Sequence, residues 1–228
     1  MPPLPTNSSF AIEHFSVGPM DNNLYLLIDH DAAEFVVIDP SMESNTALNR
    51  ALALQSAGLR LIAIWNTHGH FDHILDNALW KRAFDVPLLM HEGDLFFVER
   101  LREQALWFGF QAPDEVPPDG FFEEGQTLKV GAQSIEILHT PGHSPGSVSF
   151  YLAEHQVCIS GDVIFKGSAG RTDLPGCSEQ QLGESLNRLL LLPENTRLLP
   201  GHGPDTTVAH EKRTNPIYRS LSVASNRS

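Results

Sequence analysis

The chain has 228 residues, enough for one large core, and we expect residues 1–228 to form a single domain. Its 28 acidic and 15 basic residues give a formal charge of −13, which argues against binding to nucleic acid or to anionic membranes. No apolar run of 18 residues and no basic leader segment stand in the sequence, so we expect a cytoplasmic protein without a membrane span. Cys158 and Cys177 are expected to be free thiols.

The first half of the chain alternates predicted strands with predicted helices. Strands are predicted over Leu24–Asp29, Glu34–Asp39, Leu61–Trp65 and Val86–Met90. Helices are predicted from Leu48 through Ala51, Leu52 and Gln55 to a closing Gly58, over Asn77–Phe84, and as one long helix over Asp94–Phe108. Asp76 stands where the N-cap of the Asn77–Phe84 helix would be.

The second half is richer in strands. A Pro- and Asp-rich exposed loop is predicted over Gln111–Gly120. Strands follow at Leu128–Val130, Ser134–Leu138, Ser147–Tyr151, Val157–Ser160 and Arg197–Leu199. Ser178 and Gln181 form a capping box for a helix whose apolar stripe is Leu182, Leu186, Leu189 and Leu190. This order predicts two sheets packed face to face with helices outside, an α/β fold.

The stretch "NTHGHFDHI" places a dense group of polar side chains directly after a buried strand. It contains His68, His70, Asp72 and His73 within six residues. Residues two apart in an extended chain point to the same side, so His68 and His70 can reach one ion. Asp72 and His73 lie further along and can reach a second point. Imidazole and carboxylate are ligands that Zn²⁺ accepts.

Three later segments repeat this chemistry, each a strand that runs into a Gly- or Pro-rich loop. They are "HTPGHSPG" with His143, "ISGDVIF" with Asp162 and "LLPGHGP" with His202. Five of the eleven histidines are candidate ligands in these four loops. A structural zinc site is usually closed by four ligands, so seven ligand residues favour two ions with open positions.

These motifs resemble the metallo-β-lactamase fold superfamily, and within it the glyoxalase II (hydroxyacylglutathione hydrolase) branch. The H-x-H-x-D-H motif is specific for the superfamily, and "GDVIFKGSAGRTDLPG" resembles a loop of the short bacterial glyoxalase II-like proteins. The resemblance implies a four-layer αββα sandwich that carries two divalent ions, with zinc expected and iron or manganese as alternatives. It assigns His68, His70 and His143 to the first ion, Asp72, His73 and His202 to the second, and Asp162 to both.

Two departures from the family pattern stand out. Asp76 occupies a position that is usually glycine, which alters a turn more than the chemistry. The chain also ends about 26 residues after His202, so we expect the C-terminal helical extension of the full-length enzymes, which contacts glutathione, to be absent or vestigial.

These residues predict hydrolysis of a small-molecule thioester, and the resemblance implies a glutathione thioester such as S-lactoylglutathione. Two cations would lower the pKa of a shared water from about 15.7 toward about 7 and provide a bridging hydroxide, with Asp72 and Asp162 as the catalytic carboxylates. A thiolate leaves without a proton because thiol pKa values lie near about 8.5. Lys166 and Arg171 are basic residues close to Asp162, and the resemblance points to Arg171 as the anchor for the carboxylate of glutathione.

Other activities of the same fold remain open at this point. A mononuclear iron dioxygenase acting on glutathione persulfide needs only a subset of these ligands, and metal content with oxygen consumption would distinguish it. Lactonases and other ester hydrolases of the fold are further alternatives. A β-lactamase with a cysteine ligand is disfavoured, because Asp162 stands where that cysteine would be. The native metal, the acyl group and the oligomeric state are not predicted.

Overall fold

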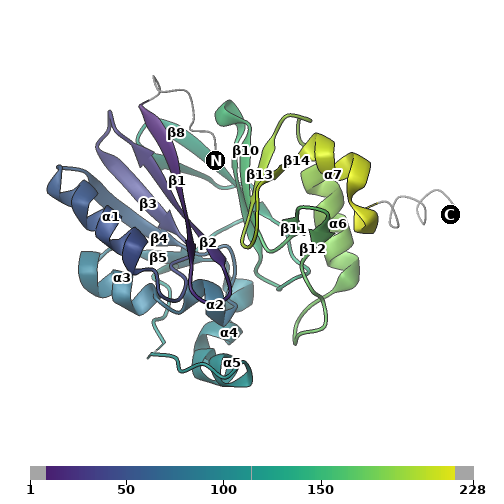
Figure 1. Ribbon diagram of the computed structural model, residues 1–228, viewed down its shortest axis with the longest axis horizontal. Helices are drawn as coiled ribbons and strands as arrows, with labels where there is room; N and C mark the ends of the chain where they lie inside the picture. The colour runs from purple at the N-terminus through teal and green to yellow at the C-terminus, as the bar shows by residue number, and fades with distance from the viewer. Residues whose placement is uncertain (1–8, 114, 219–228) are drawn as a thin grey trace, which may run out of the picture.

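The computed structural model describes residues 9–113 and 115–218, and its main feature is a pair of six-stranded sheets (Figure 1). The first sheet has the order β1 (Phe10–Val17), β2 (Asn22–Asp29), β3 (Glu34–Ile38), β4 (Arg60–Trp65), β5 (Leu88–Met90) and β6 (Gly120–Phe121). The second has the order β14 (Thr206–Thr207), β13 (Arg197–Pro200), β10 (Val157–Gly161), β9 (Val148–Leu152), β8 (Gln133–His139) and β7 (Thr127–Val130). A small hairpin of β11 (Ile164–Phe165) and β12 (Ser168–Ala169) follows β10.

Helices cover the outer faces of the two sheets. The helices are α1 (Asn45–Ser56), α2 (Phe71–Ile74), α3 (Asn77–Phe84), α4 (Leu95–Glu99), α5 (Leu101–Trp107), α6 (Glu179–Leu190) and α7 (Val208–Thr214). In the ribbon, α1 and α3 lie outside the first sheet, and α6 and α7 lie outside the second. The predicted four-layer αββα sandwich is therefore confirmed.

Successive side chains of each strand point to opposite faces of the sheet, so apolar residues can form three layers of core. In β2, Tyr25 and Leu27 face the other sheet, whereas Leu24 and Leu26 face α1. Strand β10 likewise turns Ile159 toward the first sheet and Cys158 toward α6. Each fully buried leucine contributes about 1.5–3 kcal/mol of transfer free energy, so both faces of each sheet must be covered. The helices supply that cover.

The predicted strands and helices are confirmed with boundary shifts of a few residues, apart from the long helix Asp94–Phe108, which is wrong. Asp94 belongs to a 3₁₀ turn (Glu92–Asp94), and the chain then forms α4 and α5 with a break at Arg100, whose φ is −118°. At the break the carbonyl of Phe97 accepts from the amide of Arg100 at 3.2 Å and from the side chain of Gln104, whose Nε2 lies 2.7 Å from it. A side-chain contact thus replaces part of the helical ladder.

Several smaller features differ from the sequence expectation. Strand β1 has no strong apolar alternation and was not predicted. Asp76 is the N-cap residue of α3, but its carboxylate accepts hydrogen bonds from the amide and hydroxyl of Ser44 instead of capping the helix. The buried face of α1 is Ala47, Leu48, Ala51 and Leu54, while Leu52 is 38% exposed. Within the predicted loop 111–120, residue 114 lies outside the described residues.

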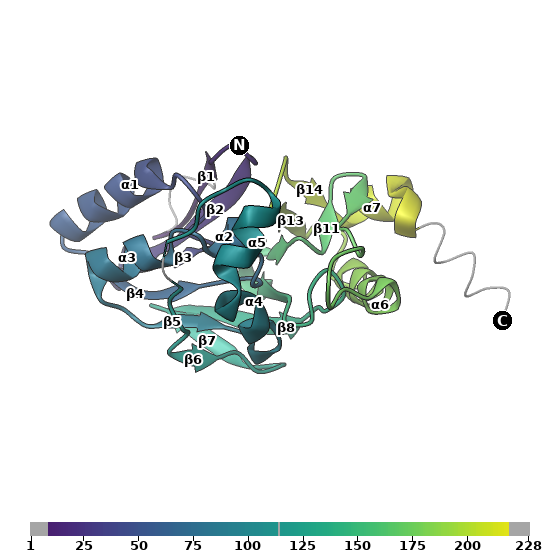
Figure 2. The ribbon, with the colours of Figure 1, turned by 90° about the horizontal axis from the view of Figure 1, so that it is seen from below.

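The connections after β4, β8, β10 and β13 meet at one edge of the sandwich. Strands β3, β4 and β5 are parallel, as are β10 and β13, so their carboxyl ends face the same way. Viewed from below, α2, α4 and α5 lie across this edge between the two outer helical layers (Figure 2). No helix within the described residues is long and apolar enough to cross a bilayer. Cys158 and Cys177 are free thiols, as predicted.

Candidate metal centre

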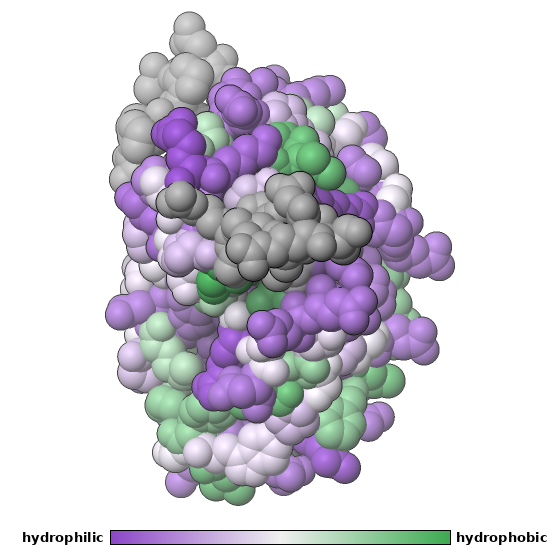
Figure 3. Space-filling view, turned by 90° about the vertical axis from the view of Figure 1, so that its right-hand side faces the viewer, coloured by the Kyte–Doolittle hydropathy of each residue, from purple (hydrophilic) through white to green (hydrophobic). Residues whose placement is uncertain are grey.

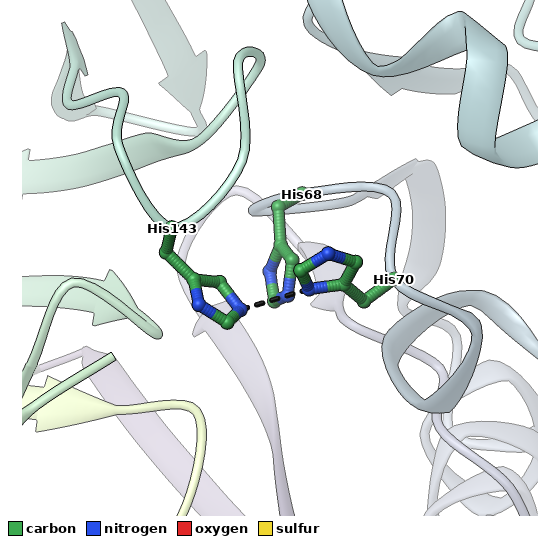
Figure 4. Close-up of side chains that lie close together, drawn as sticks. All are labelled: His68, His70 and His143. Carbon is green, nitrogen blue, oxygen red and sulfur yellow. Dashed lines mark hydrogen bonds between the residues drawn. The ribbon is translucent and has the colours of Figure 1, made fainter. Parts of the chain in front are cut away.

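Two groups of three ligand residues come together at this edge. His68, His70 and His143 form one group, in which the potential ligand atoms all lie within 4.8 Å of one another (Figure 4). Asp72, His73 and His202 form the other, with the same limit on their separations. Each group takes two residues from the loop and short helix after β4 and one from a loop that follows a strand of the second sheet. The packing of the two sheets therefore assembles both groups.

Asp162 lies between the two groups, as the resemblance implied. Its Oδ2 is 3.5 Å from Nε2 of His143 in the first group and 3.6 Å from Nε2 of His202 in the second. Its Oδ1 is 3.5 Å from Nε2 of His73. One carboxylate thus faces ligand nitrogens of both groups, which is the geometry that a bridging ligand requires.

The outer nitrogens of four of these histidines are held by oxygen atoms. Each Nδ1 lies 3.0 Å from its partner: His68 from Thr67 Oγ1, His73 from Asp39 Oδ2, His143 from the carbonyl of Arg171, and His202 from the carbonyl of Met20. The hydroxyl of Thr67 donates to Asp39, so it can only accept from His68. In this arrangement Nδ1 carries the proton, and each Nε2 directs its lone pair into the site.

Buried polar atoms without hydrogen-bond partners indicate that the residues present fit metal ions. Among the described residues, Nε2 of His68 and Oδ1 of Asp162 are buried and have no such partner. A buried polar group without a partner costs about 1–3 kcal/mol, so native proteins rarely leave one. A cation bound to these atoms would remove that cost, and imidazole with carboxylate is a donor set for borderline divalent ions.

The protonation states within the cluster favour cation binding. Burial, and then the neighbouring His143, lower the pKa of His70 to about 3, and burial lowers the pKa of His68 well below its usual value. Burial opposes ionisation of Asp162, but His73 and the other histidines bring its pKa down to about 2. Neutral imidazoles and an ionised carboxylate are the forms that bind a metal.

The pKa of His73 is shifted in the opposite direction, upward. Burial would lower its pKa, but the carboxylates of Asp72 and Asp162 raise it well above the usual value. The pKa of His202 is also raised, against the effect of burial, by Asp72 and Asp162. The carboxylates therefore attract positive charge to the second group, and a bound cation would provide that charge in place of the protons.

Asp39 is a site residue that the sequence reasoning missed. Its carboxylate accepts from the amide and hydroxyl of Thr67, both at 2.7 Å, and from Nδ1 of His73. Its φ of 55° is unusual for a residue other than glycine and is a form of strain often found at functional sites. Asp39, His68 and His73 also lie close enough to hold an ion. Because both Asp39 oxygens are already bonded on the outer side of His73, we assign Asp39 to orienting the ligands.

Asp94 connects the two loops that carry the first group of ligands. The carboxylate is fully buried and accepts from the amide of Gly69 at 2.7 Å, the hydroxyl of Ser144 at 2.6 Å and the amide of Gly146 at 2.6 Å. Gly69 lies between His68 and His70, and Ser144 and Gly146 follow His143 in its loop. Asp94 therefore sets the separation between the first two histidines and the third. The sequence reasoning had placed it in a helix.

Two further residues adjust the second group. Nδ2 of Asn22 donates to Asp72 Oδ2 at 2.9 Å, which holds that carboxylate toward His202. Gly201 passes so close to Asp162 that an added Cβ would lie 2.1 Å from Oδ1. Only glycine fits at that position. The signal available for Asn22 was an asparagine pair opening an otherwise apolar strand, "DNNLYLL".

A cavity of about 340 Å³ opens onto both groups of ligands. His70, Asp72, His143, Asp162 and His202 line it, together with Arg171 and several aromatic side chains. The guanidinium of Arg171 forms a bidentate ion pair with Asp173, with Nε–Oδ1 at 2.6 Å and Nη2–Oδ2 at 2.8 Å. Lys166 lies by a different surface hollow, so of the two basic residues singled out in the sequence only Arg171 borders the site.

This geometry can be compared with known proteins. The sequence pattern of the Metallo-beta-lactamase superfamily matches residues 17–202. The chain belongs to the metallo-beta-lactamase superfamily. The probable metallo-hydrolase YqgX of Bacillus subtilis (strain 168) is 38% identical over 212 residues, which are 91% of this chain and 97% of that protein. Hydroxyacylglutathione hydrolase GloC of Haemophilus influenzae is 37% identical over 214 residues, 92% of this chain and 99% of that protein.

The chain is also similar to a solved structure. TTHA1623, in a di-iron-bound form, is 41% identical with a TM-score of 0.80, covering 90% of this chain and 98% of that chain. The resemblance stated from the motifs is confirmed, and the protein is a metallo-hydrolase of the metallo-beta-lactamase superfamily. Its cluster of histidine and aspartate side chains is suited to binding metal ions.

Proposed function

We propose that this protein hydrolyses glutathione thioesters such as S-lactoylglutathione and carries two divalent ions, zinc being the expected metal. The observation that carries the proposal is the carboxylate of Asp162 between two groups of ligands, at the bottom of an open cavity. The similarity to GloC, named a hydroxyacylglutathione hydrolase, supports the substrate class. The di-iron form of TTHA1623 supports a site for two ions.

In this proposal each group of ligands would hold one ion, and Asp162 would serve both. When bound, the two cations supply Lewis acidity, which makes water a nucleophile near neutral pH and polarises a carbonyl oxygen. The other functions belong to the chain. Asp39 and Thr67 keep the imidazoles in the tautomer that presents Nε2, and Asp94 keeps the two loops at a fixed separation.

Asp72 is the carboxylate proposed to orient the attacking water. It lines the cavity, and Asn22 donates to its Oδ2. Burial opposes its ionisation, but His73 and then His202 and Asn22 keep its pKa well below the usual value. Asp72 therefore stays ionised and can accept a hydrogen bond from water at neutral pH. A C–O bond forms at the acyl carbon, the C–S bond breaks, and the products are a carboxylic acid and a thiol.

A thioester fits this site better than an amide would. A thiolate is a stable leaving group because thiol pKa values lie near about 8.5, whereas an amine leaving group needs a proton in the transition state. The carboxylates that line the cavity, Asp72 and Asp162, both have lowered pKa values and are poor proton donors at neutral pH. The electrostatics of the site thus favour a substrate whose leaving group needs no acid.

Arg171 is proposed to bind a carboxylate of the glutathione carrier. Its partner Asp173 is exposed, and exposed ion pairs contribute only about 0–1 kcal/mol, so a substrate carboxylate can displace it. Arg171→Ala should raise KM for S-lactoylglutathione about tenfold to a hundredfold with kcat retained. Asp173→Asn should lower that KM, because it frees the guanidinium. A small uncharged thioester should respond to neither change.

The proposed function is tested by measuring metal content and thiol release on the same preparation. Protein purified without chelator should contain close to two divalent ions per chain and release thiol from S-lactoylglutathione. Removing the ions should abolish thiol release, and zinc should restore it. One iron per chain, with oxygen consumed on glutathione persulfide and no thiol released from the thioester, would instead identify a sulfur dioxygenase.

A further inference from the structure

We propose that the aromatic wall, defined as Phe97, Trp107 and Phe108, binds a bulky apolar acyl group, so that arylacyl thioesters are preferred over lactoyl thioesters. The inference rests on the proposed thioester hydrolysis and specifies its substrate class. All three residues line the cavity that contains the metal ligands. They come from α4, α5 and the residue after α5, which lie across the site edge of the sandwich.

The aromatic wall begins directly at the first group of ligands. The ring of Phe97 packs edge-on against the ring of His70, with centroids 4.8 Å apart. Phe108 stacks on Phe71, the residue next to His70, at 5.1 Å. A carbonyl carbon held at the ligands would therefore place one of its substituents against these rings. Aromatic side chains of this kind give large apolar contact areas and favour stacking with other rings.

Two of the three side chains of the aromatic wall are unusually exposed for their size, while Phe97, next to His70, is 3% exposed. Trp107 is 55% exposed and Phe108 is 41% exposed, although both face the cavity. In the space-filling view, hydrophobic side chains gather toward the lower end of the molecule, the end where α4 and α5 lie in Figure 1 (Figure 3). A substrate that covered these rings would remove apolar surface from water, which is the main source of affinity in such pockets.

Arg171 lines the same cavity from a different element, the loop after β12, and its carbonyl accepts from Nδ1 of His143. We assign the glutathione carrier to Arg171 and the acyl group to the aromatic wall, because a carboxylate is attracted to a guanidinium and an apolar group to an apolar surface. Gln104 also lines the cavity, but its amide nitrogen already donates to the carbonyls of Phe97 and Gly69. A lactoyl hydroxyl therefore gains little from this wall, while an aryl ring gains stacking contacts.

The experiment compares two thioesters that share one carrier, S-lactoylglutathione and S-phenylacetylglutathione, in the metal-loaded protein. We expect kcat/KM to be about tenfold or more higher for the phenylacetyl substrate, the discrimination typical of an apolar pocket. Trp107→Ala should reduce kcat/KM for the phenylacetyl substrate about tenfold more than for the lactoyl substrate, mostly through KM. Leu106→Ala is the matched control, since Leu106 is the preceding residue, is 68% exposed and does not line the cavity.

A binding measurement separates this inference from the proposed function. Trp107 is the exposed tryptophan of the three in the chain, because Trp65 is 2% and Trp80 is 0% exposed. Phenylacetate should shift the tryptophan emission to shorter wavelength in the wild type and in Leu106→Ala, but not in Trp107→Ala. If the protein hydrolyses neither thioester, the proposed function is wrong. The fluorescence titration would then test, on its own, whether the aromatic wall binds an aryl group. Equal kcat/KM for both thioesters, or an absent spectral shift, would overturn the inference.

Discussion

At each of the two edges of the sandwich, a buried carboxylate accepts hydrogen bonds from two loops and so joins them. At one edge the joined loops border the cavity that contains the ligands. At the site edge, Asp94 accepts from Gly69, Ser144 and Gly146. At the opposite edge, where β2 ends, Asp29 accepts from Asp31, Ala32, Ala132 and Gln133. Both carboxylates are almost fully buried. The loops at the opposite edge are closed by Asp29, whereas those joined by Asp94 remain open to a cavity.

The two edges differ in whether the polar groups near each carboxylate have hydrogen-bond partners. Around Asp29, the side chain of Gln133 donates to the carboxylate through Nε2 and its Oε1 lies 2.6 Å from Nε2 of His155. Near Asp94, Nε2 of His68 and of His70 are buried without hydrogen-bond partners. The groups around Asp29 are thus satisfied by protein partners, while the site edge leaves buried ligand nitrogens that a bound cation can satisfy. Substitutions at the two edges test this contrast.

Asp162→Ala should have the largest effect. It removes the one carboxylate that faces both groups of ligands, so both positions should lose metal and kcat should fall by at least about a hundredfold. Metal analysis after dialysis and the thioester assay provide the measurements. Asp29→Ala is the control at the opposite edge and should reduce stability without changing metal content. An Asp162→Ala protein that kept both ions would show that the two positions do not share this ligand.

Asp94→Asn should weaken metal binding about tenfold to a hundredfold, the usual range for residues that position ligands. The three groups bonded to Asp94 are all donors, and an asparagine amide would turn its own donor toward one of them. The His68 loop and the His143 loop would then move apart. Titration of zinc against a competing chelator gives the affinity.

Asp29→Asn is the matched change at the opposite edge. It puts a donor among four donors in a similarly buried place, so it should lower the free energy of unfolding by about 1–3 kcal/mol. Its zinc affinity should equal that of the wild type. If both variants lost affinity to the same extent, Asp94 would act through general stability and not through the positions of the loops.

The sequence predicted the ligands but not the residues that position them. His68, His70, Asp72 and His73 form a local motif, and His143, Asp162 and His202 each follow a strand in a Gly- or Pro-rich loop, so short patterns were sufficient. Asp94, in contrast, bonds to groups 25, 50 and 52 residues away. Its role depends on how two loops pack, and no local pattern contains that information.

The misassigned helix has a related cause. The stretch Asp94–Phe108 has the composition of one helix, and local propensity favours it. Tertiary bonds outweigh that preference, because Asp94 is used by the two ligand loops and Gln104 reaches Phe97 and Gly69. The resulting break at Arg100 separates α4 from α5, and both helices contribute residues to the cavity. The role of Arg171 stays a prediction, since its guanidinium is paired with Asp173.

The smallest expected effect concerns the response of the two edges to acid. At the site edge, His91 stacks on His139 with ring centroids 4.1 Å apart, and His139 bonds through Nε2 to Pro145 in the His143 loop. Burial, and then the charge of His139, lower the pKa of His91 to about 4. Between about pH 6.5 and 4 the unfolded chain therefore binds a proton at this position that the folded chain does not bind. The stability contributed by neutral His91 is fully present above pH 6.5 and is lost as the pH falls toward 4.

His91→Asn should reduce this loss of stability in acid. Asparagine can still accept a hydrogen bond from the amide of Gly93, as His91 does, but it does not titrate. Since His91 is only partly buried, we expect a difference of about 1 kcal/mol in the free energy of unfolding between pH 7 and pH 4.5, measured by urea titration of chelator-treated protein. His155→Asn tests the opposite edge, where burial also lowers the histidine pKa but Glu154 raises it, so its effect should be smaller. If His91→Asn lost as much stability in acid as the wild type, the stacked pair would not contribute to the acid sensitivity, and the difference between the edges would reside in the ligand groups alone.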